Sequence, residues 1–424
     1  MMINSVKGKK LLVLGGSVDE IDLVLRAQKL GVYVIVSDYY TDMNISPAKR
    51  VADEVWNISW SDVDAITEKC IEAGVDGVTA GYSEIKIDML IRICEKLGLP
   101  CYATAEQLEI TRDKVKFKNT CRKNGVPVVK EYASPEDVDE YPVIVKPVDR
   151  GGSIGISVAN NKAELINAYN YAMEMSLKKE VIIEKYMDAQ KMDVYYAIED
   201  GVSTLITTND ALMASDNGTE RVVQSSWLYP HKHVDNLIEK ADESLKRMIA
   251  DMGIKYGCIF FSGFVDENLD YAFFECGFRL EGGHQYEYAR RRGFMNFNDI
   301  FILHALTGST EGMERGNEFN PKLKMATVNF YAKDGVISEI NGAEKIKEMK
   351  DCTFVQVNAA VGQECTTDKA ILRKLGMCSF ANECSEVISE NVKKAYALFS
   401  VTDENGEDMI YDRIDTDLIS KWWD

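Results

Sequence analysis

Short apolar runs alternate with longer amphipathic stretches over residues 9–105. The short runs have the length of buried strands, and the longer ones repeat their apolar positions with the period of a helix. The predicted strands are Lys10–Gly15, Val32–Ser37 and Gly77–Ala80, and the predicted helices are Glu20–Leu30, Val63–Ala73 and Ile85–Leu97. Strands separated by helices of this length are typical of βαβ units, so residues 1–105 are expected to form a Rossmann-like domain with a parallel sheet.

The turn after the first predicted strand, Gly15-Gly16-Ser17, raises the question of a dinucleotide site. Such a turn can place phosphate at a helix N-terminus, and Asp38 at the end of the second strand suits a ribose. The full glycine fingerprint is absent, because Val18 to Ile21 contain no glycine. We therefore favour a tight turn that opens a helix over an NAD site.

A more mixed pattern follows in residues 106–310, and a third, β-rich region in residues 311–424. The predicted helices are Thr111–Asn124, Lys162–Met175, Val234–Gly253 and Glu386–Phe399. The predicted strands are Val128–Tyr132, Val143–Lys146, Ile156–Ala159, Val181–Met187, Val194–Ile198, Val202–Thr208, Ile259–Asp266, Tyr271–Glu275, Met325–Tyr331 and Thr353–Val357. The predicted class is α/β, with α+β character in the middle of the chain.

Composition narrows the function classes. The 424 residues carry a formal net charge of −19, which argues against general affinity for nucleic acid or for an anionic membrane. The apolar run Leu11–Leu14 is too short for a signal peptide core, and no segment reaches membrane length. Ten cysteines are scattered without a CxxC pair, which is typical of buried free thiols in a reducing cytoplasm.

The stretch Tyr141–Asn161 carries the first chemical signal. A strand ends in Lys146, and Gly151, Gly152 and Gly155 follow before a second apolar run. This glycine turn is either a plain hairpin or a mobile cover that presents backbone N–H groups to phosphates. Lys114 lies on an earlier predicted helix, and two lysines that converge on one site are costly unless a polyanion neutralises them.

Later residues add the parts of a nucleotide site. Glu184–Met187 follow an apolar strand, where backbone groups can read an adenine, and Asp193 lies one short loop later, suited to a ribose hydroxyl. Glu275 ends another apolar strand, and Arg279 follows it. These two supply a metal-type carboxylate and a cation for developing phosphate charge.

This order of parts resembles the ATP-grasp superfamily over essentially the whole chain, and most of all its biotin carboxylase-like branch, which includes phosphoribosylglycinamide synthetase and L-amino-acid ligases. The stretches that carry the resemblance are LGVYVIVSDYYTDMNISPAKRVADEVW, TRDKVKFKNTCRKNGVPVV, VIVKPVDRGGSIGISVA, IIEKYMD and FFECGFRLEGGH. The resemblance implies an ATP-grasp domain over residues 106–310, with a small clamp lobe at about residues 115–190, and a C-terminal β-rich domain. It also implies that the glycine turn is a mobile loop.

The resemblance also implies roles for individual residues. Lys114 and Lys146 match lysines that contact nucleotide phosphates, and Gly151, Gly152, Ser153 and Gly155 match the loop over these phosphates. Glu184, Lys185, Tyr186 and Met187 match the adenine hinge, where Lys185 and Met187 act through their backbone. Asp193 stands near the ribose position, Glu275 matches the ligand of Mg²⁺ (or Mn²⁺), and Arg279 matches the catalytic arginine, acting with Lys146 on the phosphates.

Two positions depart from the family pattern. Gly277 stands where the E-x-N-x-R segment has a metal-binding asparagine, and Ser262 stands where the preceding strand has an acid, although Asp266 is close by. These departures predict either a thinner metal shell or a loss of activity.

The resemblance implies an ATP-dependent, ADP-forming carboxylate–amine ligase with ATP and Mg²⁺ as cofactors. A small carboxylate is phosphorylated to an acylphosphate, and an amine then displaces phosphate. Glu84, Glu281 and His284 are the candidate substrate residues, although a loop histidine such as His284 can equally be solvated. Two alternatives stay open: a bicarbonate-activating carboxylase, and a catalytically weakened nucleotide-binding subunit. The expected partners are small molecules and, as an open possibility, a second copy in a homodimer, with no nucleic acid and no membrane.

Overall fold

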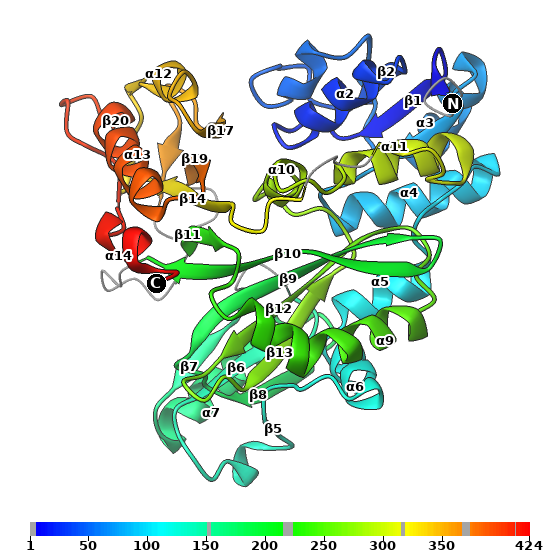
Figure 1. Ribbon diagram of the computed structural model, residues 1–424. Helices are drawn as coiled ribbons and strands as arrows, with labels where there is room; N and C mark the ends of the chain where they lie inside the picture. Colours follow the sequence, from blue (N-terminus) through cyan, green and yellow to red (C-terminus); the bar gives the residue numbers. More distant parts are fainter. Residues whose placement is uncertain (1–5, 151–153, 215–223, 315–318, 367–373, 412) are drawn as a thin grey trace.

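The structure, a computed structural model, describes residues 6–150, 154–214, 224–314, 319–366, 374–411 and 413–424. Its N-terminal part is a four-stranded parallel sheet in the order β3-β2-β1-β4 (Figure 1). The elements are β1 (Lys10–Leu14), α2 (Glu20–Lys29), β2 (Tyr33–Ser37), β3 (Glu54–Trp56), α3 (Val63–Ala73), β4 (Gly77–Thr79) and α4 (Glu84–Leu97). The predicted Rossmann-like arrangement is therefore confirmed.

The turn between β1 and α2 is filled by protein side chains. Glu20 is fully buried, and its carboxylate accepts hydrogen bonds of 2.5 Å each from Ser17 Oγ and Lys86 Nζ. A Cβ atom at Gly15 would lie 2.3 Å from Lys86 Nζ. This ion pair occupies the space beside the turn, which supports the interpretation of the turn as a structural one.

A helix from much later in the chain completes this N-terminal unit. Helix α11 (Phe297–Thr307) packs against β4, where a Cβ atom at Gly77 would lie 2.4 Å from the carbonyl oxygen of Ala305. Arg26 on α2 holds Asp299 on α11 through bonds of 2.6 and 2.7 Å. The N-terminal sheet is therefore covered by residues that lie far beyond position 105.

The small lobe lies at the other end of the molecule (Figure 1). It is an antiparallel sheet in the order β5-β8-β6-β7, with α7 against one face. Its strands are β5 (Glu131–Tyr132), β6 (Val143–Pro147), β7 (Ser157–Ala159) and β8 (Val181–Lys185), and its helix is α7 (Lys162–Met175). Helices α5 (Ala105–Arg112) and α6 (Lys114–Asn124) lead into this lobe.

An eight-stranded sheet forms the centre, in the order β13-β12-β9-β10-β11-β14-β19-β17. Its strands are β9 (Gln190–Glu199), β10 (Val202–Met213), β11 (Gln224–Tyr229), β12 (Gly257–Val265), β13 (Tyr271–Gly277), β14 (Lys324–Tyr331), β17 (Cys352–Val357) and β19 (Lys374–Asn382). Strands from the predicted C-terminal region thus continue the sheet of the middle region. A separate apolar core lies between these strands and α13 (Ser385–Leu398).

Three local predictions are wrong. The helix expected over Thr111–Asn124 is broken at Asp113, which ends α5 and caps α6 by accepting from the N–H groups of Val115 and Lys116. The helix expected over Val234–Gly253 is a series of α8 (Val234–Leu237), a π-helical turn (Ile238–Asp242) and α9 (Glu243–Asp251). Asp193, expected on a loop, lies inside strand β9.

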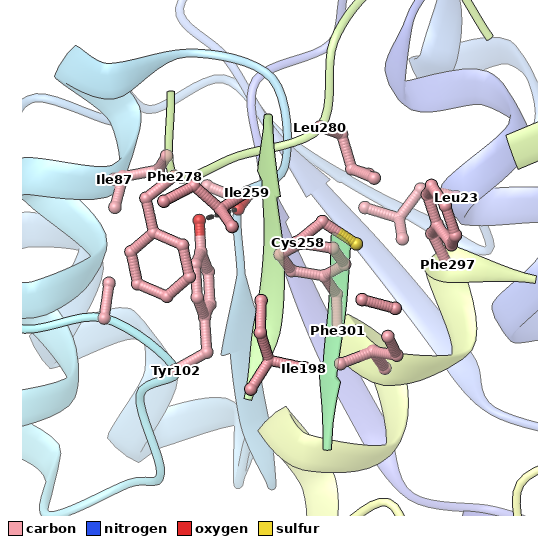
Figure 2. Packing of buried hydrophobic residues seen from close by; sticks show 14 of the residues in the cluster. Leu23, Ile87, Tyr102, Ile198, Cys258, Ile259, Phe278, Leu280, Phe297 and Phe301 are labelled. Atoms are coloured by element: carbon pink, nitrogen blue, oxygen red, sulfur yellow. Dashed lines mark hydrogen bonds between the residues drawn. The ribbon is translucent and has the colours of Figure 1, made fainter. Parts of the chain in front are cut away.

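One continuous apolar core joins the N-terminal sheet to the central sheet (Figure 2). The ring of Tyr102 meets Phe278 and Phe301 edge-on, with centroids 5.2 and 4.8 Å away, and its hydroxyl donates to Ala80 O over 3.4 Å. Phe278 directly precedes Arg279, so this core fixes the backbone that carries the arginine. In the part of the chain that the structure describes, no helix is long and apolar enough to cross a bilayer.

Candidate functional site

Two lysines hold a buried carboxylate where the small lobe faces the central sheet. Glu184 on β8 is 2 % exposed; Lys146 Nζ on β6 lies 2.5 Å from its Oε2 atom, and Lys118 Nζ on α6 contacts its Oε1 atom. Burial alone raises the pKa of Glu184, but the two ammonium groups outweigh it and the pKa is lowered. The sequence placed Glu184 at an adenine hinge, and the structure shows that its side chain also fixes Lys146. Its contact with adenine stays a prediction.

Lys114 is the second predicted phosphate lysine, and the structure brings it to the same place. Its Nζ atom donates to Arg150 O over 2.7 Å, at the base of the glycine loop. Burial lowers the pKa of Lys114, and Lys146 lowers it further, whereas Glu275 and Glu184 raise it. Lys114 therefore lies within electrostatic reach of both Lys146 and Glu275, while the contact of the two lysines with phosphates stays a prediction.

The base of the glycine loop is anchored to the end of α7. Ser176 Oγ and the N–H of Lys178 donate to the carboxylate of Asp149 over 2.9 and 2.8 Å, and Arg150 Nε donates to Met175 O over 2.8 Å. Gly155 has φ +75°, and a Cβ atom there would lie 2.7 Å from atoms of both Met175 and Pro147. Gly151, Gly152 and Ser153 lie outside the described residues, so their predicted contact with phosphate stays a prediction.

The predicted adenine hinge has part of its backbone engaged in the small sheet. The N–H of Lys185 donates to Lys130 O over 3.0 Å, and the N–H of Tyr186 donates to Pro142 O over 3.1 Å. In this conformation Lys185 can offer an adenine only its carbonyl oxygen. Backbone contacts by Lys185, Tyr186 and Met187 stay predictions.

Across from the lysines, a row of polar residues crosses four strands of the central sheet. Ser262 on β12 lies directly opposite Glu275 on β13 and directly opposite Asp193 on β9, and Asp193 in turn lies opposite Asn209 on β10. Residues opposite each other in a sheet share a face. The register also answers the question about Asp266: this residue closes the β12–β13 turn through bonds to the N–H groups of Asn268 and Asp270.

Asp193 is the buried carboxylate of this row. It is 1 % exposed; Ser262 Oγ donates to its Oδ1 atom over 2.6 Å, and its Oδ2 atom has no hydrogen-bond partner among the described residues. Burial raises its pKa, Lys191 and the Ser262 hydroxyl lower it, and the charge of Glu275 raises it. A buried carboxylate oxygen without a partner costs free energy. A cation bound at this atom would remove that cost.

The aromatic ring of Phe274 lies close to two lysines, one from each lobe. Lys146 Nζ lies 5.6 Å from its centroid, and Lys191 Nζ lies 5.7 Å from it. Because a ring face attracts cations, Phe274 stabilises an ammonium group from each lobe beside the site. Lys191 thus joins the set of positive charges at the site, a contribution that the sequence analysis missed.

The family's asparagine cannot stand at position 277 without a change nearby. A Cβ atom at Gly277 would lie 2.5 Å from Cε1 of Phe260, on the neighbouring strand. The Phe260 ring in turn carries the guanidinium of Arg279, whose Cζ atom lies 5.1 Å from the ring centroid. The absence of a side chain at Gly277 therefore leaves room for the Phe260 ring, and this ring packs against the guanidinium of Arg279.

Glu84 contacts this arginine. Its Oε1 atom lies 3.6 Å from Arg279 Nε, and its Oε2 atom lies 3.8 Å from Arg112 Nε. Glu84 is the first residue of α4. The structure gives it a partner in the site, while its predicted contact with substrate stays a prediction.

Glu281 lies at the centre of a second hydrogen-bond network. Tyr195 Oη and Gln285 Nε2 both donate to its Oε2 atom over 2.5 Å, and Asn209 Nδ2 donates to Tyr195 Oη over 3.0 Å. Burial raises the pKa of Glu281 to about 7, and the charge of Asp193 raises it as well. Glu281 therefore lies beside the polar row, and its predicted contact with substrate stays a prediction.

His284 is a buried residue, so the alternative interpretation of it as a solvated loop histidine is wrong. It is 4 % exposed; its Nδ1 atom contacts Tyr286 Oη and its Nε2 atom lies 2.5 Å from Gln356 Oε1. Tyr286 Oη also donates to Asp22 on α2. His284 therefore joins the N-terminal unit to the C-terminal strands, and its predicted contact with substrate stays a prediction.

Sequence reasoning missed several members of the site. No motif singles out Lys118, which is fully buried on α6. The other missed residues come to the site through strand pairing, except Gln285, which starts α10 (Gln285–Arg291) and contacts Glu281 four residues earlier. They are Lys191, Tyr195, Asn209, Gln285 and Lys374.

A two-lobed arrangement with lysines on the small lobe facing carboxylates on a large sheet defines the ATP-grasp fold. A family model described as the D-ala D-ala ligase C-terminus matches residues 96–216. The solved L-amino acid ligase from Bacillus licheniformis has a TM-score of 0.73 at 16 % identity, covering 94 % of this chain and 100 % of that one. The biotin carboxylase domain of the Hydrogenobacter thermophilus 2-oxoglutarate carboxylase has a TM-score of 0.75 at 18 % identity, covering 93 % and 90 %. The chain thus has the fold of the ATP-grasp superfamily, and the resemblance drawn from its sequence is confirmed.

Sequence similarity covers a smaller part of the chain. The formate-dependent phosphoribosylglycinamide formyltransferase of Prochlorococcus marinus (strain NATL1A) is 26 % identical over 258 residues. The alignment covers 58 % of this chain and 64 % of that relative, so the chain spans less than two thirds of the relative's length.

Proposed function

We propose that this protein is an ATP-dependent ligase that activates a small carboxylate as an acylphosphate and joins it to an amine. The observation that carries the proposal is the set of charges around β13: Lys146 lies over the ring of Phe274, next to Glu275 in the chain, and Lys114 is within electrostatic reach of both Lys146 and Glu275. Arg279 follows the same strand. Phosphoryl transfer demands positive charge placed around the phosphates more than covalent chemistry by the protein. The excess of lysine over carboxylate on the small-lobe side suits a polyphosphate.

Two carboxylates fit a divalent cation. Glu275 is exposed on the face of β13, and Asp193 Oδ2, one strand beyond Ser262, is buried without a partner among the residues that the structure describes. We assign both as ligands of Mg²⁺ or Mn²⁺, which replaces the ribose role expected for Asp193. When bound, the metal would neutralise charge on the nucleotide phosphates. The missing acid at Ser262 is thus supplied by its neighbour, which favours an active enzyme over a weakened one.

The remaining side chains place charge and exclude water. Lys114 and Lys146 hold the phosphates of ATP, and Glu184 with Lys118 keeps Lys146 in position. Arg279, supported by the Phe260 ring and by Glu84, neutralises charge that develops on the transferred phosphoryl group. A loop of Gly151, Gly152, Ser153 and Gly155 over the phosphates would exclude water from the acylphosphate.

Proteins similar to this chain support the reaction class. The similar solved structures include one named as an L-amino acid ligase and one named as a 2-oxoglutarate carboxylase domain in complex with MgADP, ADP and bicarbonate. The second name supports the alternative function, activation of bicarbonate. It also names a dimer, and we include a homodimer and a cytoplasmic location in the proposal.

The test is phosphate release from Mg-ATP with panels of carboxylates and amines, and with bicarbonate as a separate sample. Lys146→Ala is the inactivating variant, and Lys345→Ala, an exposed lysine on α12 (Ala343–Lys347), is the matched control. Release that requires an acid and an amine together, and disappears only in Lys146→Ala, supports the ligase. Release with bicarbonate alone supports the carboxylase, and unchanged release by Lys146→Ala contradicts both.

A further inference from the structure

A lysine without an acid partner lies on the same face of the central sheet, toward its C-terminal strands. Lys374 begins β19; its Nζ atom lies 5.3 Å from the ring centroid of Trp227 on β11 and 3.4 Å from Met377 Sδ. Among the residues that the structure describes, no carboxylate lies within ion-pair distance of it. Burial lowers the pKa of Lys374 to about 8, against the charges of Asp19 and Glu281, which raise it. A partly buried ammonium group without a counter-charge costs free energy. An anionic ligand bound beside it would remove that cost.

Buried polar atoms without partners lie beside this lysine. Within the described residues, Trp227 Nε1, Tyr229 Oη and Asn209 Oδ1 have no hydrogen-bond partner. Trp227 lies opposite Ala211 in the β10–β11 pair, and alternation along each strand puts Asn209 and Tyr229 on the same face. Nearly all buried polar atoms in proteins are hydrogen-bonded, so three unpaired ones on one face indicate a missing binding partner.

Glu281 connects this cluster to the metal row. Glu281 accepts a hydrogen bond from Tyr195 Oη, which in turn accepts one from Asn209 Nδ2. Asn209 belongs to the cluster and lies directly opposite Asp193, so it links Glu281 to both. Both hydrogen bonds that reach the Glu281 carboxylate end on Oε2, from Tyr195 and Gln285. One end of the cluster is therefore acidic and close to the predicted phosphates, and the other end is basic and farther away.

We propose that these side chains form the amine subsite and that the amine substrate is an amino acid, with its ammonium group at Glu281 and its carboxylate at Lys374 and Trp227 Nε1. This assignment rests on the proposed ligase function. It places the nucleophile at the end nearest Asp193, where the acylphosphate forms. A simple alkylamine would leave the charge of Lys374 uncompensated, so the subsite selects against it.

The subsite also provides a proton acceptor for the step in which the amine attacks the acylphosphate. Glu281 takes one proton from the ammonium group, and the neutral amine attacks the acyl carbon. The C–O bond to phosphate breaks, its electron pair leaves with phosphate, and the second N–H proton passes to that phosphate. The products are an amide, ADP and inorganic phosphate, with the ammonium proton held on Glu281 until solvent removes it.

Calorimetric titration of the full chain with the standard L-amino acids, in the presence of Mg-ADP, tests the subsite. Lys374→Met keeps the length of the side chain without its charge. Lys324→Met is the matched control, because Lys324 also begins a strand and lies over a tryptophan, 5.4 Å from the Trp423 ring. We expect Lys374→Met to bind amino acids about tenfold or more weakly than Lys324→Met, as removal of a charged hydrogen bond does.

Amino acid amides provide the second arm, since they keep the ammonium group and lack the carboxylate. They should bind the wild type weakly and bind Lys374→Met with the same affinity. Equal binding of acids by Lys374→Met and the wild type, tight binding of amides by the wild type, or no binding of any amino acid overturns the subsite. Phosphate release in the same samples tests the ligase separately: binding without turnover contradicts the ligase alone, and turnover with an unselective subsite contradicts the subsite alone.

Discussion

The hydroxyl of Ser262 donates a 2.6 Å hydrogen bond to Asp193, the residue directly opposite it on the next strand, while Glu275 faces Ser262 from the other side. The carboxylate that the family pattern places on β12 is thus found one strand away, on β9. A position can lose its acid without loss of the site when a cross-strand neighbour faces the same space.

Moving the carboxylate back across the strand pair tests this relationship. Asp193→Ser should weaken binding of Mn²⁺ in the presence of ADP by at least the roughly 10–100-fold that loss of an outer-shell partner costs. Adding Ser262→Asp to that variant should restore part of the affinity, because the acid then stands beside Glu275 again. Calorimetry with Mn²⁺ and ADP measures both. Wild-type affinity in Asp193→Ser would exclude Asp193 as a ligand.

Substitutions of the two predicted phosphate lysines should both weaken ADP binding but should differ in their effect on the free energy of unfolding. Lys146→Met removes a partner of buried Glu184 and should lower the free energy of unfolding by about 1–3 kcal/mol, since Lys118 still pairs with that carboxylate. Lys114→Met should change stability by no more than about 0.5 kcal/mol, because Lys114 donates only to a backbone carbonyl. Both should weaken ADP binding. Urea unfolding and ADP titration of the same samples measure the two effects, and tight ADP binding by Lys114→Met would contradict the site.

Restoring the family residue at position 277 should damage the protein. Gly277→Asn drives a Cβ atom against Phe260 and should cost about 1–3 kcal/mol of stability by overpacking. Phe260→Ala should relieve this cost in the double variant, so the two substitutions are expected to be non-additive. A double-mutant cycle by urea unfolding measures the coupling. If the stability changes of the two substitutions are additive, the backbone around position 277, and not the Phe260 ring, moves to accommodate the asparagine.

Lys374→Met should stabilise the fold while it weakens substrate binding. The pKa of Lys374 is lowered from an ordinary 10.5 to about 8 by burial, against the charges of Asp19 and Glu281. Between these values the unfolded chain binds more protons, so wild-type stability rises with pH across the window, and below about pH 8 the buried charge is a full cost. The variant should therefore be more stable at pH 7 by about 1–3 kcal/mol, with the gain fading toward pH 10.5. A less stable variant in urea unfolding at pH 7 would contradict the assigned environment.

Local sequence signals were sufficient wherever an element is defined by its own caps. Helices α3 and α7 have the predicted bounds, because Asp62 and Asn161 cap their first turns with side-chain oxygens. Gly74, with φ 64°, ends α3 in the left-handed conformation that glycine favours. Lys146 was singled out in a similar way, since it ends a predicted strand, whereas Lys114 was matched through the family resemblance.

The rest depends on contacts that spacing does not encode. Asp113 interrupts an apparently continuous helix, because its side chain caps α6 while its backbone is extended. Asp193 meets Ser262 only through strand register, and His284 is buried because a C-terminal strand supplies Gln356. A single sequence does not show which strands pair with which, so the contacts of these residues could not be predicted from it.

The contact of Gly77 with the backbone of α11 bears on the order in which the chain can fold during synthesis. The first four strands leave the ribosome early, but the helix that covers β4 is made only after the small lobe and much of the central sheet. Until Ala305 has emerged, the N-terminal sheet must hold an uncovered apolar face, of the kind that chaperones recognise. The nascent N-terminal sheet is therefore the stage at which this chain is most exposed to aggregation.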